Sequence, residues 1–239
     1  MDNYYKKGIS NVSYNNFLKV ARCFFSWCTE KMYIKENVFA TIKPKKREQK
    51  KRTIIDKDYR NIITKHLTEK GDFYFLLVMN LIYSSLIRPK EVCNLQIKHI
   101  DLENKVINIP SSISKTHYER FSAITPEIEN LIEKLDITSY NKELYIFGSG
   151  KKMQPSTKPF NPHSLTKKFE RLRNELNLPK NFQLYSFRDS GINNMLLSGI
   201  DALSVMQHAD HHDLSITTRY ANHQNKQLTD KIYNESPKF

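Results

Sequence analysis

The stretch SSLIRPKEVCNLQIKHIDLENKVINI, residues 84–109, contains the change from helical to strand sequence that decides the fold. Pro89 suits the first turn of a helix, where a missing backbone N–H costs no hydrogen bond. Residues 91–95 continue that helix. Residues 105–109 then alternate in polarity and are rich in β-branched side chains, which is typical of a strand. The stretch therefore predicts a short helix followed by a strand.

The flanking sequence supplies partners for both elements. Residues 120–124 can pair with residues 105–109, which places Lys115 near the tip of a β-hairpin. Residues 73–85 are apolar on nearly all faces and too many for a typical strand, so they predict a buried helix. Residues 164–176 show one clean apolar face and predict an amphipathic helix. Together these elements indicate a mainly α fold with a small antiparallel β-sheet, of the α+β class.

The N-terminal sequence predicts a smaller helical part joined by a basic linker. Residues 13–34 form an amphipathic helical pattern, and its apolar stripe is Phe17, Ala21, Phe24, Cys28 and Met32. The segment TIKPKKREQKKR, residues 41–52, has seven basic residues against one acidic and no apolar period, so we expect an extended linker. Its candidate DNA-binding residues are Lys43, Lys45, Lys46, Arg47, Lys50, Lys51 and Arg52. A solvated segment without a role is the alternative.

The sequence of the C-terminal third predicts helices. Gly199 interrupts it first, and a cluster of histidines and aspartates at residues 208–213 interrupts it again. Ser215 is expected to be the N-cap of a short helix that carries Tyr220.

Composition favours a nucleic-acid partner and a cytoplasmic location. The 239 residues carry a net charge of +13, which raises the local concentration of polyanions. Three widely spaced cysteines, Cys23, Cys28 and Cys93, cannot form a disulfide framework, so a reducing compartment is expected. The longest apolar stretch is too short for a membrane span, and no secretory signal pattern is present.

Five residues scattered along the chain share a chemistry: Arg88, Lys115, Arg188, His211 and Tyr220. Four cationic or hydrogen-donating side chains can hold a phosphodiester and neutralise its developing charge, and a tyrosine can attack it. A planar guanidinium group can donate two parallel hydrogen bonds to two oxygens of one phosphate, which a lysine ammonium cannot do. This combination predicts cutting and rejoining of DNA strands.

The motifs resemble those of the tyrosine recombinase, or phage integrase, family. Arg88 and Glu91 have the R-x-x-E spacing of its first arginine box, and KTHYERFSAIT is similar to the strand turn that delivers the family's lysine. YSFRDS with Arg188 is similar to its H-x-x-R segment, and HHDLSITTRY resembles its segment with a histidine nine residues before a tyrosine. The resemblance covers roughly residues 53–225.

The resemblance implies the domain organisation and the roles of the residues. Residues 1–40 are expected to be part of a helical core-binding domain shorter than the family's usual one, residues 41–52 a linker, and residues 53–239 the catalytic domain. Tyr220 would be the nucleophile that forms a 3′-phosphotyrosyl link, and Lys115 would protonate the leaving 5′ oxygen. The implied catalytic set is Arg88, Lys115, Tyr185, Arg188, His211 and Tyr220, with Glu91 in support. Neither a metal nor another cofactor would be needed.

The sequence departs from the family pattern at three positions. Tyr185 stands where the family has a histidine, and a phenol is a poor proton acceptor because its ordinary pKa is near ~10. Leu86 and Asp210 stand where the family has glycines, which is expected to reshape both loops. An anionic Asp210 is also an awkward neighbour for a phosphate.

Two other interpretations concern single residues. The cluster of His208, Asp210, His211, His212 and Asp213 could be a metal site, since His208 and His212 are spaced i, i+4. Tyr233 competes with Tyr220 as the nucleophile, but no histidine stands nine residues before it.

The function expected from all this is a DNA integrase or recombinase of a mobile element. The chain would act on double-stranded DNA as a homotetramer at synapsis and would be monomeric when free. Two alternatives stay open. One is a catalytically inert DNA-binding relative or truncated remnant, and the other is a Xer-like resolvase of chromosome dimers.

Overall fold

The computed structural model describes residues 8–46 and 53–221, apart from the side chains of residues 219–221. The chain divides into two compact units, residues 1–51 and residues 52–239.

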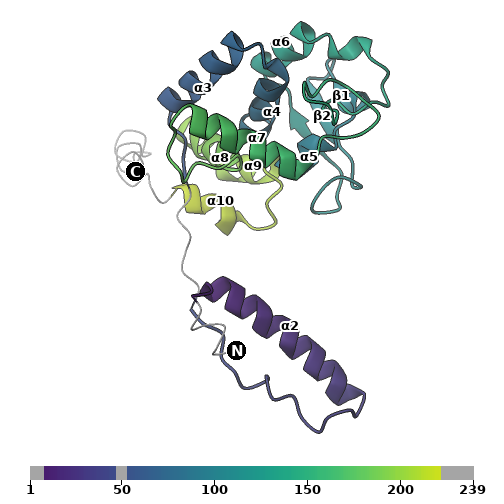
Figure 1. Ribbon diagram of the computed structural model, residues 1–239, viewed down its shortest axis with the longest axis vertical. Helices are drawn as coiled ribbons and strands as arrows, with labels where there is room; N and C mark the ends of the chain where they lie inside the picture. The colour runs from purple at the N-terminus through teal and green to yellow at the C-terminus, as the bar shows by residue number, and fades with distance from the viewer. Residues whose placement is uncertain (1–7, 47–52, 222–239) are drawn as a thin grey trace, which may run out of the picture. The chain divides into compact units, whose positions relative to one another are not determined.

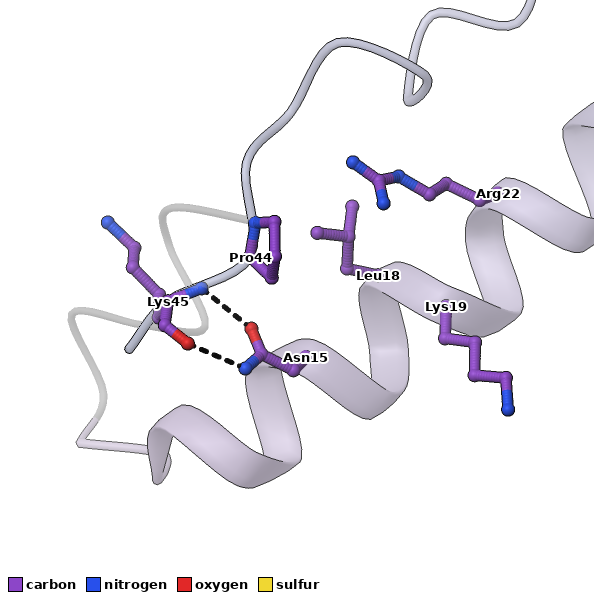
Figure 2. Close-up of a pocket in the computed structure, with 6 residues that line it drawn as sticks. All are labelled: Asn15, Leu18, Lys19, Arg22, Pro44 and Lys45. Carbon is purple, nitrogen blue, oxygen red and sulfur yellow. Dashed lines mark hydrogen bonds between the residues drawn. The ribbon is translucent and has the colours of Figure 1, made fainter. Parts of the chain in front are cut away.

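The first unit is built on one long helix, α2 (Asn11–Glu30), with Ser10 as its N-cap. The chain turns after Lys31 and returns along the helix, held by side-chain bonds to its backbone. Arg22 donates to the carbonyl oxygens of Phe39 (3.0 Å) and Ala40 (3.2 Å). Asn15 exchanges two bonds of 2.8 Å with the backbone of Lys45, as Figure 2 shows.

The returning segment determines which face of α2 is buried, and the predicted stripe was wrong in part. The buried residues are Tyr14, Asn15, Leu18 and Cys28. Phe17 and Phe24 are exposed, and Met32 lies beyond the helix end with a positive φ. Spacing alone located the helix but did not show which of its faces the return segment would cover.

The second unit is centred on α4 (Phe73–Tyr83), which contacts α3 (Lys57–Glu69), α5 (Pro89–Cys93), α6 (Pro126–Lys134) and α8 (Ser186–Leu197) (Figure 1). The Asp72 side chain caps its first turn by accepting from the Phe75 N–H. Nearly every α4 side chain is buried, as its apolar sequence predicted. This helix forms the middle of the core.

A small antiparallel sheet in the order β1-β2-β3 follows α5 in the chain. Its strands are β1 (Ile100–Asp101), β2 (Val106–Ile109) and β3 (Arg120–Ala123). Ile109 pairs with Arg120 at the end of the β2–β3 ladder. The loop between them therefore contains Lys115, which confirms the predicted hairpin.

The remaining helices complete the unit. They are α7 (Pro162–Glu175), α9 (Ala202–His208), α10 (Leu214–Ala221) and the 3₁₀ turns Ile97–His99 and Ile137–Ser139. The predicted amphipathic helix is α7, with Asn161 as its cap. Two predicted details were wrong. Leu95 lies after the end of α5, and Ser215 lies inside α10, where its N–H is bonded by the Asp213 side chain (2.8 Å). The fold class is the predicted one, mainly α with a small antiparallel sheet.

Two further sequence predictions concern the cysteines and the membrane-spanning potential of the chain. All three cysteines are unbridged thiols, and Cys23 is exposed while Cys28 and Cys93 are buried. Within the described ranges, no helix combines the length and apolarity that crossing a membrane requires.

Candidate active site

Arg88 enters the site from the turn that follows α4. Leu86 in that turn has φ 50° and is fully buried, so a leucine holds the left-handed conformation that usually belongs to glycine. Arg88 is the N-cap of α5, and its backbone N–H donates to Glu91 Oε2 at 3.0 Å. Leu86 thus has a backbone conformation that glycine adopts at lower cost.

Glu91 joins three parts of the site. Its side chain is buried, and Oε1 accepts from Arg88 Nη1 (3.1 Å) and from the backbone N–H of Lys115 (3.0 Å). Oε2 accepts from Arg120 Nη2 at 2.7 Å. One carboxylate thus fixes the Arg88 guanidinium, the hairpin loop and the first residue of β3 relative to one another.

Arg188 is a fully buried cation. It lies in the first turn of α8 and has no exposed surface. Its Nη2 donates to the Ala209 carbonyl, while Nε and Nη1 are buried without a partner. Burial, with the positive charges of Arg88 and Arg120, lowers the pKa of Arg188 to about 10. The side chain therefore stays charged at neutral pH and holds N–H groups ready for an acceptor.

Sequence reasoning missed Arg120, a third largely buried guanidinium whose charge acts on that of Arg188. Its Nε and Nη1 are also buried without a hydrogen-bond partner. Burial lowers the pKa of Arg120 from its usual value, and the charges of Glu91 and Asp210 oppose that shift. The sequence signal was weak, since a strand's first arginine is ordinarily a surface residue.

Asp210 is the second carboxylate of the site. It lies between α9 and α10 with φ 51°, again where glycine is expected. Oδ2 accepts from Arg88 Nη1 at 2.6 Å, and the Asp210 carbonyl accepts from Arg88 Nη2 at 2.8 Å. Burial disfavours the charge on Arg88, but the bonds to Asp210 and the charges of Glu91 and Asp210 outweigh it and raise the pKa of Arg88.

His211 is held by the helix that carries the tyrosine. Its Nδ1 lies 3.0 Å from Thr217 Oγ1, and Thr217 is fully buried in α10. Tyr220 follows Thr217 by about one turn of α10, the same helix. The side chain of Tyr220 lies outside the described part of the structure.

Lys115 and Tyr185 both have solvent-exposed side chains. The Lys115 side chain is exposed on the hairpin loop, while its backbone is fixed by Glu91. Tyr185 precedes α8 and is 37% exposed, and its carbonyl accepts from the Arg188 N–H at 3.1 Å. The site therefore combines a buried guanidinium cluster with partly open neighbours.

The metal interpretation of residues 208–213 finds no support in the contacts. His208 Nε2 donates to the Ser84 carbonyl (3.0 Å), Asp210 binds Arg88, and His211 contacts Thr217. Among the residues with described positions, no three histidine, cysteine or acidic side chains gather closely enough to hold an ion.

The predicted DNA-binding residues are described only in part. Lys43, Lys45 and Lys46 have exposed side chains in the segment that returns along α2. Arg47, Lys50, Lys51 and Arg52 lie outside the described residues.

Comparison with known proteins gives consistent relatives. The model of the Phage integrase family matches residues 52–227. Tyrosine recombinase XerC of Rickettsia prowazekii (strain Madrid E) is 27% identical over 227 residues, covering 91% of this chain and 70% of that protein. XerC of Rickettsia canadensis (strain McKiel) is 26% identical over 213 residues, covering 85% of this chain and 66% of that protein. The chain thus spans about two thirds of these relatives' length.

Solved structures share the fold at low sequence identity. The integrase of transposon Tn1549 in complex with circular intermediate DNA matches with a TM-score of 0.70 and 16% identity, covering 91% of this chain and 77% of that one. A lambda integrase dimer bound to a COC′ core site matches with a TM-score of 0.73 and 14% identity, covering 94% of this chain and 63% of that one.

Proposed function

Because this chain belongs to the phage integrase family, whose members are site-specific tyrosine recombinases, we propose that it cuts and rejoins DNA strands through a 3′-phosphotyrosyl intermediate. The proposal covers the activity of the whole protein, its DNA substrate and its assembly.

The observation that carries the proposal is the guanidinium cluster. Glu91 and Asp210 form ion pairs with Arg88 and Arg120, whereas Arg188 forms no ion pair with a carboxylate among the described residues. Four nitrogen atoms of Arg120 and Arg188 are buried without acceptors. A buried donor without a partner costs about 1–3 kcal/mol. A phosphodiester anion supplies the missing charge and the missing acceptors together.

The chemistry then follows from the residues around that cluster. The Tyr220 oxygen attacks phosphorus, the bond from phosphorus to the 5′ oxygen breaks, and the 3′ end stays attached to the tyrosine. Lys115 gives its proton to the leaving 5′ oxygen, which is a poor leaving group as an alkoxide. His211 and Tyr185 donate hydrogen bonds to the phosphate. The phenol of Tyr185 accepts protons poorly, so the proton of the Tyr220 hydroxyl passes to solvent.

Strand exchange requires several protomers, and we propose a homotetramer on DNA formed from protein that is monomeric when free. The basic segment 41–52 tracks the duplex backbone and adds affinity without sequence preference. Such a reaction takes place in the cytoplasm, where the element's DNA is.

The biological substrate has two candidates. The first is a mobile element, the kind of DNA named for the transposon integrase among the structural neighbours. The XerC relatives favour a Xer-like resolvase instead. The position of the sites separates them, since a mobile element carries its sites at its own ends.

The test is strand exchange in vitro between two DNA fragments that carry the candidate site from flanking genomic sequence. Reactions contain EDTA and no ATP. We expect recombinant fragments with the wild-type protein and none with Tyr220→Phe, while Tyr233→Phe stays active. Binding of the site by wild-type protein without any exchanged or cut strand would contradict the proposal and favour an inert DNA-binding relative.

A further inference from the structure

The Asp210 carboxylate lies among groups that could bind an oxyanion. Its Oδ2 is 2.6 Å from Arg88 Nη1 and 4.0 Å from Arg120 Nε. Thr116 Oγ1 lies 3.0 Å from Oδ2 and 3.2 Å from Oδ1, and its hydroxyl donates there because an ionised carboxylate only accepts. Two guanidinium groups and one hydroxyl thus surround a single anion.

Asp210 and the residues around its carboxylate come from three separate parts of the chain. Arg88 comes from the start of α5, Arg120 and Thr116 from the β2–β3 hairpin, and Asp210 from the loop between α9 and α10. Asp210 is the anion of this group, and its side chain is 17% exposed, while those of Arg88 and Arg120 are 12% and 10% exposed. It is therefore the group best placed to leave.

Arg88 has little left for a DNA phosphate while Asp210 is in place. Its Nη1 already donates to Glu91 and to Asp210, and its Nη2 donates to the Asp210 carbonyl. An approaching phosphate also meets the negative charge of Asp210 at close range, where repulsion is weakly screened.

We propose that Arg88, Arg120 and Thr116 form a subsite for an oxygen of the scissile phosphate, and that Asp210 fills this subsite until DNA replaces it. The proposal rests on the proposed function for the identity of the ligand. It adds Arg120 and Thr116 to the residues that contact phosphate, and it makes Asp210 a determinant of phosphate affinity.

The first test measures inorganic phosphate binding at constant ionic strength by calorimetry. Asp210→Asn keeps the size and the tolerance for a positive φ but removes the charge. We expect Asp210→Asn and Asp210→Gly to bind phosphate about tenfold more tightly than wild type, as suits the loss of one nearby negative charge. Asp201→Asn is the matched control, since asparagine caps α9 as well as aspartate does and the same charge is removed.

A second variant tests the subsite itself. Adding Thr116→Val to Asp210→Gly removes the hydroxyl that would then face the phosphate, so most of the gained affinity should disappear. Phosphate affinity that is unchanged or weaker in Asp210→Asn, with folding verified by circular dichroism, would overturn the proposal. Asp210 would then be a residue that only holds Arg88 in position.

The third readout separates this inference from the proposed function. A suicide DNA substrate carrying the candidate site should form covalent adduct faster with Asp210→Asn than with wild type. Tighter phosphate binding without adduct in any variant would uphold the subsite and contradict the recombinase activity. Adduct with wild type that becomes slower in Asp210→Asn would contradict the displacement of Asp210.

Discussion

At the scale of single residues, two side chains stand in for glycine beside the arginine cluster. Leu86 and Asp210 both have positive φ, the backbone conformation that glycine adopts most readily. A left-handed conformation disfavours residues with a Cβ, less so for aspartate than for leucine. The burial of Leu86 in the packing against α8 and α9 compensates for its strain.

Thr217 is expected to position His211 rather than to touch the phosphate. Replacing it by valine keeps the shape but removes the hydroxyl that lies 3.0 Å from His211 Nδ1. We predict that Thr217→Val lowers the rate of adduct formation roughly tenfold, as for a catalytic hydrogen bond weakened by misplacement, and leaves DNA affinity unchanged. Thr217→Ser should restore the rate. Equal rates for wild type and Thr217→Val would show that the contact has no role.

His208 makes the folded protein sensitive to mild acid. Burial lowers the pKa of His208, the charges of Arg120 and Arg188 act in the same direction, and the bond to Ser84 opposes them. Below the ordinary pKa of histidine, His208 therefore binds a proton more readily in the unfolded chain than in the folded protein. The contribution of His208 to stability is therefore fully present above its ordinary pKa, 6.5, and is lost as the pH falls below that value.

Urea unfolding at about pH 7.5, 6.5 and 5.5, a range that brackets the ordinary pKa of histidine, measures this effect. His208→Gln does not titrate and can still donate to Ser84, so its stability should fall less over the same range. Parallel curves for the two proteins would rule out His208 as the source.

At the scale of elements, the close packing of α8 on α4 depends on one glycine. A Cβ on Gly191 would lie 1.9 Å from the Tyr83 carbonyl oxygen and 2.8 Å from Leu86 Cδ2. We predict that Gly191→Ala destabilises the fold by about 2 kcal/mol or more, because backbone must move. Gly150→Ala is the control, since nothing lies within 4 Å of its added Cβ. Chemical denaturation that finds equal stability for both variants would contradict this account.

Elements with strong patterns could be predicted from sequence, and their surroundings could not. The apolar run of α4, the hairpin and the face of α7 depend on local residues, so their patterns sufficed. The buried face of α2 depends on the segment that returns along it, and spacing does not contain that information. The grouping of Arg88, Glu91 and Arg188 followed from motif order, whereas Arg120 and the Asp210 contact depend on tertiary geometry.

At the scale of the whole molecule, the first unit should contribute affinity for DNA in general. Asn11, Asn15 and Arg22 bind the backbone of residues 39–46, which leaves the lysine side chains exposed. We predict that replacing Lys43, Lys45 and Lys46 by glutamine weakens binding to specific and nonspecific duplexes alike. The slope of log affinity against log salt should become shallower by about two to three, at about 0.9 per lost phosphate contact.

Binding titrations on both duplexes over a range of salt concentrations give that slope. A variant that loses affinity for the specific site alone would contradict a backbone-tracking role for this segment.

The central claim is that the arginine cluster holds a scissile phosphate that Tyr220 attacks. The most direct measurement is mass spectrometry of the covalent product formed on a suicide substrate, after protease and nuclease digestion. The account predicts a nucleotide attached through its 3′ phosphate to the peptide that contains Tyr220, and a free 5′ hydroxyl on the other DNA end. Attachment at another tyrosine, attachment through a 5′ phosphate, or intact DNA bound by folded protein would contradict it.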